Sequence, residues 1–86
     1  AKALPLIDGL IAEEPRNPYF HELKGQMLYE NGRAVEAIPH YQQSVDLLPD
    51  NALLRTQLAQ AQIQSENMGL NKAAIANLEK ARELDD

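Results

Sequence analysis

The sequence of 86 residues contains no cysteine. A chain without thiols can form neither a disulfide nor a thiolate metal site, and its redox compartment stays undetermined. Hydrophobic residues make up 44% of the chain and charged residues 24%, which is ordinary for a folded domain and too apolar for a disordered one. The length allows one domain with a modest core.

Positive charge is also scarce. Eight Lys and Arg residues stand against 13 Asp and Glu residues, which gives a formal net charge of −5. Binding to a phosphate backbone requires clustered Lys and Arg to displace counterions. The composition therefore argues against nucleic acid as a partner.

Long apolar runs are missing. No stretch approaches the roughly 20 residues needed to cross a bilayer, and no signal peptide is present. We expect no transmembrane segment in these residues. Because the sequence opens inside a repeat unit, we expect it to be a piece of a longer protein, so the missing signal does not indicate where that protein resides.

The sequence repeats itself at a spacing of 34 residues. Pro49 corresponds to Pro15, and Asn51 corresponds to Asn17. Apolar residues recur at three and four within each segment, which is the spacing of one helical face. The pattern predicts five antiparallel helices and no strand, with turns near 15–17, 31–33, 49–51 and 65–70.

The spacing changes once, near residues 65–70. Ala74 and Leu78 match Ala37 and Tyr41 at 37 residues, so three residues are inserted. An insertion inside a helix would rotate its apolar face by most of a turn. We therefore predict that the extra residues lie in the turn and that Asn71 caps the last helix, which runs to about Leu84.

The 34-residue unit resembles a tetratricopeptide repeat. Its marks are Gly25 in the first helix, Ala37 and Tyr41 in the second helix, and the closing Pro49. The resemblance implies an all-α, right-handed α-solenoid of about two and a half units in one domain. Residues 1–16 would be the second helix of a partial repeat, 17–50 a full repeat, and 51–86 a second repeat with the insertion.

Catalytic or metal-binding motifs are weak. His21-Glu22 begins like the zinc motif His-Glu-x-x-His, but Gly25 stands where the second His is required. We interpret His21 as a surface or interface residue and His40 as a packing or solvent residue. No nucleophile–base constellation is evident, so we expect neither enzymatic activity nor a cofactor in this chain.

In tetratricopeptide proteins the first helices line a concave groove that holds peptides. Tyr41 corresponds to a core aromatic, whereas Tyr19 and Tyr29 lie away from the main apolar stripe and are either groove residues or ordinary surface. The predicted binding surface consists of Tyr19, Glu22, Gln26, Tyr29, Leu53, Gln57, Gln60 and Ile63. No cationic clamp is present on it, so an acidic chaperone tail is a poor ligand; a protein or other peptide is the expected partner.

A narrower resemblance covers residues 4–26, where Leu-Pro-Leu-Ile is followed by Glu-Glu-Pro and Asn-Pro-Tyr-Phe-His-Glu-Leu-Lys-Gly-Gln. This sequence is similar to the C-terminal repeats of bacterial zinc metalloproteases of the M48 (Ste24-like) family. It implies a periplasmic recognition arm, with zinc only in the parent's catalytic domain, which could itself be the partner. The alternative is a repeat adaptor of an unrelated assembly, for example in the cytoplasm.

Overall fold

The chain folds into five helices in a computed structural model that describes residues 3–65 and 68–85. They are α1 (Ala3–Glu13), α2 (Pro18–Glu30), α3 (Ala34–Leu47), α4 (Ala52–Gln64) and α5 (Met68–Asp85). No strand occurs in these ranges. The predicted all-α class and the helix count are confirmed.

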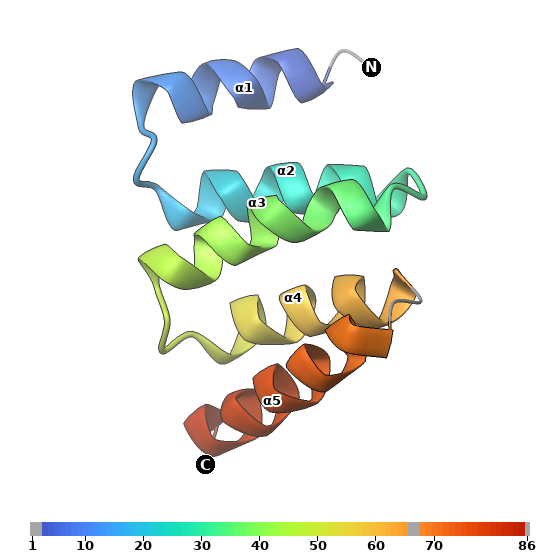
Figure 1. Ribbon diagram of the computed structural model, residues 1–86. Helices are drawn as coiled ribbons and strands as arrows, with labels where there is room; N and C mark the ends of the chain where they lie inside the picture. Colours follow the sequence, from blue (N-terminus) through green and yellow to red (C-terminus); the bar gives the residue numbers. More distant parts are fainter. Residues whose placement is uncertain (1–2, 66–67, 86) are drawn as a thin grey trace.

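The helices stack in chain order from α1 to α5, and successive helices run in opposite directions (Figure 1). α2 packs against α3, α3 against α4, and α4 against α5, while α1 lies on α2. The α2–α3 turn, the end of α4 and the start of α5 lie at one edge of the molecule, and the α1–α2 and α3–α4 turns lie at the opposite edge (Figure 1). This arrangement is that of helical hairpins in a solenoid.

The residues at the helix termini have the capping roles that the sequence predicts. The Asn17 side chain accepts a hydrogen bond from the Tyr19 amide at 2.9 Å, and Asn51 accepts one from the Leu54 amide at 3.0 Å. Gly32 has φ 76°, the left-handed conformation that favours glycine after a helix. The 34-residue spacing therefore repeats the caps as well as the apolar face.

The last helix begins earlier than predicted. α5 starts at Met68, so Asn71 lies inside it and does not cap it, and its Oδ1 is buried without a hydrogen-bond partner. Residues 68–70 are therefore helical and add about one helical turn before Asn71. Residues added there leave the direction of the following apolar face unchanged, just as residues in a loop would.

The core lies between α2, α3 and α4. Its buried members are Leu28, Ala37, Tyr41, Val45, Leu54, Leu58 and Ala61. Gly25 is where α2 and α3 approach closely, because a Cβ atom on it would lie 2.9 Å from Cδ1 of Tyr41. The predicted roles of Gly25 and Tyr41 in packing follow from this contact.

A polar side chain occupies the same place in both repeats. His21 Nε2 lies 2.7 Å from the Pro15 carbonyl oxygen, and Arg55 Nε donates to the Pro49 carbonyl at 2.7 Å. His21 and Arg55 are 34 residues apart, as are the two prolines. His21 is only 6% exposed, so of the two predicted places, surface or interface, the surface is excluded. It joins the end of α1 to the start of α2.

Arg55 continues into a polar network between α4 and α5. Its Nη1 donates to Asn77 Oδ1 at 3.0 Å, and Asn77 Nδ2 donates to Gln62 Oε1 at 3.2 Å. Gln62 is 4% exposed. Since Leu28 holds the equivalent place in the first repeat, the second repeat has a polar group where the first has an apolar one.

We expect the stability of the fold to decrease as the pH falls below about 6.5, partly through His40. Burial lowers the pKa of His40, and the positive charges of Lys24 and His21 lower it further, while Asp8 and a hydrogen bond to Gln43 oppose the change. A pKa below the unfolded value means that the unfolded state binds more protons, so acid favours unfolding. Urea unfolding at pH 7.5 and 5.5 measures this, and His40→Gln should reduce the difference. An unchanged difference in the variant would contradict the assignment to His40.

Candidate protein-binding surface

The predicted surface residues of α2 share one face of the helix. Tyr19, Glu22, Gln26 and Tyr29 are spaced by three, four and three residues. Tyr19 is 54% exposed and Gln26 is exposed, whereas Glu22 and Tyr29 are half-buried. The face is therefore most accessible at its N-terminal end.

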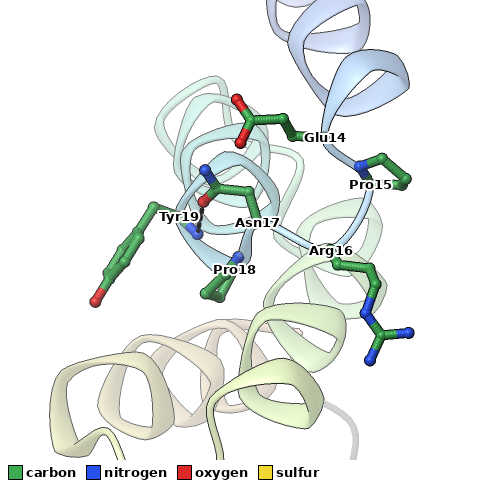
Figure 2. A pocket seen from close by; sticks show the side chains of 6 residues that line it. All are labelled: Glu14, Pro15, Arg16, Asn17, Pro18 and Tyr19. Atoms are coloured by element: carbon green, nitrogen blue, oxygen red, sulfur yellow. Dashed lines mark hydrogen bonds between the residues drawn. The ribbon is translucent and has the colours of Figure 1, made fainter.

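Tyr19 owes its position to the start of α2. Asn17 caps the helix and Pro18 occupies its first position, so the chain enters α2 with a fixed direction. The Tyr19 ring extends into solvent on the side opposite Pro15 and Arg16 (Figure 2). The shallow hollow that these turn residues line has side chains that diverge, and it offers no convergent set of polar groups.

Tyr29 has a different environment. Its side chain packs against the core cluster and also lines a hollow of about 350 Å³ with Gly32, Ala34, Val35, Gln64 and Ser65. This hollow lies where the ends of α2 and α4 meet the start of α3. Truncation of Tyr29 would therefore affect packing as well as any ligand, and Tyr19 is the better-exposed aromatic.

On α4 the structure supports three of the predicted residues as accessible. Leu53 is 60% exposed, Ile63 is 48% exposed, and Gln60 is exposed. Gln57 is half-buried, and its Oε1 is buried without a hydrogen-bond partner. Its side chain is thus less available than the prediction requires.

The 34-residue spacing explains the difference at Gln57. Tyr19, Gln26 and Tyr29 correspond to Leu53, Gln60 and Ile63, but Glu22 corresponds to Thr56. Thr56 is half-buried, and its hydroxyl donates to the Ala52 carbonyl at 2.9 Å. The same shift of 34 residues, applied to Glu22, predicts Thr56 and not Gln57 as the equivalent residue of α4.

The α2 part of this surface is acidic. Burial is the main cause that raises the pKa of Tyr41 to about 12, and the carboxylates of Glu22 and Glu30 and the Tyr29 phenol contribute to the same rise. These acids therefore lie near enough to the Tyr41 phenol to disfavour its ionisation. Among the predicted surface residues none is a cation, so the electrostatics disfavour an anionic ligand.

The described part of the chain offers neither a metal site nor a membrane-spanning helix. No group of three or more His, Cys, Asp or Glu side chains there could hold a metal ion. None of the helices in ranges 3–65 and 68–85 has both the length and the apolar character needed to cross a membrane.

Comparison with known families agrees with the hairpin geometry. A family model described as "Tetratricopeptide repeat" matches residues 28–69, from the end of α2 into the start of α5. Residues 28–69 are therefore similar to a tetratricopeptide repeat. The matched region holds Ala37, Tyr41 and the closing Pro49, which are three of the residues that carry the resemblance in the sequence.

A similar helical arrangement occurs in a solved structure named MamA MSR-1 C2. The two share 29% sequence identity and superpose with a TM-score of 0.82 over 96% of this chain. This chain spans 46% of the length of that chain, so the MamA chain is about twice as long as the matched part. A search of curated protein sequences found no match.

Proposed function

We propose that this tetratricopeptide domain is a protein–protein interaction module that binds through the outer faces of α2 and α4. The observation that carries the proposal is the pairing of exposed side chains at repeated positions: Tyr19 with Leu53, and Gln26 with Gln60. Large apolar side chains held on rigid helices supply contact area at little conformational cost. The amide side chains between them can bond to a peptide backbone.

The chemistry of the surface restricts the ligand. Glu22 lies on the same face of α2 as Tyr19, both Glu22 and Glu30 lie near Tyr41, and none of the predicted surface residues is a cation. A ligand with apolar side chains and neutral or positive charge suits this surface. A chain ending in an acidic tail does not.

We expect Tyr19→Ala and Leu53→Ala each to weaken peptide binding by about fivefold or more, since truncating an anchor removes roughly 1 kcal/mol of affinity. Peptides selected from a displayed random library against the wild-type chain serve as ligands, and fluorescence anisotropy measures their affinity. Leu6→Ala is the matched control, because Leu6 is 72% exposed on α1, outside this surface. Thermal unfolding should be unchanged in all three variants.

Two outcomes would overturn the proposal. One is that the selection enriches no peptide. The other is that the enriched peptides bind Tyr19→Ala and Leu53→Ala as tightly as they bind the wild-type chain. Equal weakening by Leu6→Ala would also count against the α2 and α4 surface.

The finer part of the proposal concerns the parent protein. The sequence of residues 4–26 supports attachment to an M48-type zinc metalloprotease of the bacterial envelope. In that protein this domain would be a periplasmic recognition arm, and the catalytic domain would be one of its partners. The competing assignment is an adaptor of an unrelated assembly. The complete reading frame decides between them: a signal peptide and an upstream His-Glu-x-x-His are expected, and their absence would refute the protease assignment.

A further inference from the structure

The turn between α2 and α3 contains a chemically reactive pair of residues. Asn31 is followed by Gly32, and this is the one place in the sequence where glycine follows asparagine. Both residues are exposed to solvent. Glycine has no side chain to shield its backbone nitrogen, so that nitrogen can approach the Cγ carbon of the preceding asparagine. The pair is therefore a candidate for a modification that needs no enzyme.

The two atoms that would react are held apart in the folded chain. Ring closure through Cα, Cβ and Cγ of Asn31 requires the Gly32 nitrogen to lie on the same side as Cβ about the Cα–C bond. Asn31 has ψ 13°, which places that nitrogen beside the Asn31 backbone nitrogen instead. A large rotation about ψ must therefore precede any reaction.

Hydrogen bonds at the end of α2 oppose this rotation. The Gly32 amide donates to the Tyr29 carbonyl at 3.0 Å, and the Arg33 amide donates to another carbonyl of the last turn of α2 at 2.9 Å. The Asn31 side chain is also held, because its Nδ2 donates to the Met27 carbonyl at 2.7 Å. Rotation about ψ of Asn31 breaks the bonds of the two amides that follow it, so the turn must open first.

We propose that Asn31 undergoes spontaneous deamidation when the α2–α3 turn opens locally. The Gly32 nitrogen gives its proton to hydroxide and forms a bond to Cγ of Asn31. The Cγ–Nδ2 bond breaks, and Nδ2 leaves as ammonia after taking a proton from water. Water then opens the five-membered imide ring at either carbonyl, which leaves an aspartate or an isoaspartate at position 31.

The product should weaken the turn in which it forms. A carboxylate cannot donate to the Met27 carbonyl, and it adds negative charge at the C-terminal end of α2 beside the exposed Glu30. Negative charge is unfavourable there, because the helix dipole is negative at that end. Asn31→Asp should therefore melt at a lower temperature than Asn31→Ala, which loses the same donor without adding charge. Salt should reduce the difference between the two variants.

The experiment compares the folded 86-residue chain with the same chain unfolded in guanidinium chloride. Both are incubated at mildly alkaline pH, and peptide mapping by mass spectrometry measures the conversion of amide to acid at each asparagine. We expect position 31 to convert in the unfolded chain, and to convert about tenfold or more slowly in the folded chain, because only the opened fraction reacts.

Other residues of the same chain supply the controls. Asn51 precedes alanine and Asn77 precedes leucine, so both should keep their amides while position 31 converts. Gly25→Leu, which disturbs the contact between α2 and the Tyr41 ring of α3, should speed conversion in the folded chain. Gln42→Ala changes an exposed residue of α3 and should leave the rate unchanged.

Equal rates in the folded and unfolded chains would refute protection by the turn. Conversion of Asn51 or Asn77 as fast as position 31 in the unfolded chain would refute the role of the neighbouring glycine. Reaction through local opening is refuted if the folded chain keeps the Asn31 amide after the unfolded chain has converted completely, and Gly25→Leu does not change this.

Discussion

Gly25→Leu should lower the free energy of unfolding by roughly 3 kcal/mol, since overpacking a well-filled core costs about 1–3 kcal/mol and sometimes more. For a domain of this size that corresponds to a fall in melting temperature of more than about 10 °C. The physical reason is the Tyr41 ring. A Cβ at Gly25 would already lie 2.9 to 3.0 Å from three ring carbons, and the Tyr41 residue is only 3% exposed.

Gly9→Ala is the matched control. Gly9 also lies inside a helix, but a Cβ there meets nothing within 4 Å. Replacement should raise stability by about 0.5–1 kcal/mol, because alanine loses less backbone freedom in a helix. Thermal unfolding followed by circular dichroism compares the two variants; if Gly25→Leu is as stable as the wild type, the close packing of α2 on α3 is refuted.

The second repeat suggests a compensating change. Ala59 stands at the position of Gly25, and Leu78 stands at the position of Tyr41. A smaller side chain on the second helix is thus paired with a larger residue on the first. We therefore expect Gly25→Ala to be destabilising alone and Tyr41→Leu to relieve part of that loss in the double variant, as a double-mutant cycle would measure.

Asn77→Ala should destabilise the fold by about 1–3 kcal/mol, the loss expected when a buried polar group is left without its partner. Asn77 accepts from Arg55 and donates to Gln62, and Gln62 is 4% exposed. Without Asn77, the Gln62 oxygen keeps no donor in this network. Urea unfolding of the variant measures the effect.

Two further variants test this explanation. Gln42→Ala removes an exposed side-chain hydrogen bond to Asp46 and should change stability by less than about 0.5 kcal/mol. Gln62→Leu combined with Asn77→Leu makes both positions apolar, as Leu28 is in the first repeat, and should recover much of the stability. If Asn77→Ala unfolds no more readily than Gln42→Ala, the network contributes little.

Most of the fold follows from the sequence because its strongest signals are local. Asn17, Asn51 and Gly32 act within one turn of their own positions, and the 34-residue spacing carries the hairpin from one repeat to the next. Gly25 could be assigned to a close contact because its partner Tyr41 lies at a characteristic place in the unit. At these residues the local capping and packing preferences and the 34-residue repeat predict the same helical hairpins.

The sequence leaves some features open or places them wrongly. These features depend on contacts between residues far apart in the chain, or on alternatives that the apolar pattern cannot distinguish. His21 is buried because it reaches the Pro15 carbonyl, which apolar periodicity does not reveal. The predicted start of α5 is wrong because three inserted residues before the apolar stripe leave its direction unchanged, whether they lie in a turn or in the helix. At the position of Glu22 the repeat shift points to Thr56 instead of Gln57, and a binding role for Gln57 stays a prediction.

The size difference between the pairs Gly25–Tyr41 and Ala59–Leu78 also bears on how the chain avoids misassembly. Antiparallel hairpins of similar sequence can exchange partners between molecules or within one chain, a known failure of repeat proteins during folding. If α3 packed on α4 in the manner of α5, the Tyr41 ring would meet the Cβ of Ala59, whereas its own partner Gly25 has none. Each first helix is thereby matched in volume to its own second helix. Exchange of partners would therefore produce a clash where Tyr41 meets Ala59 and an unfilled space where Leu78 meets Gly25.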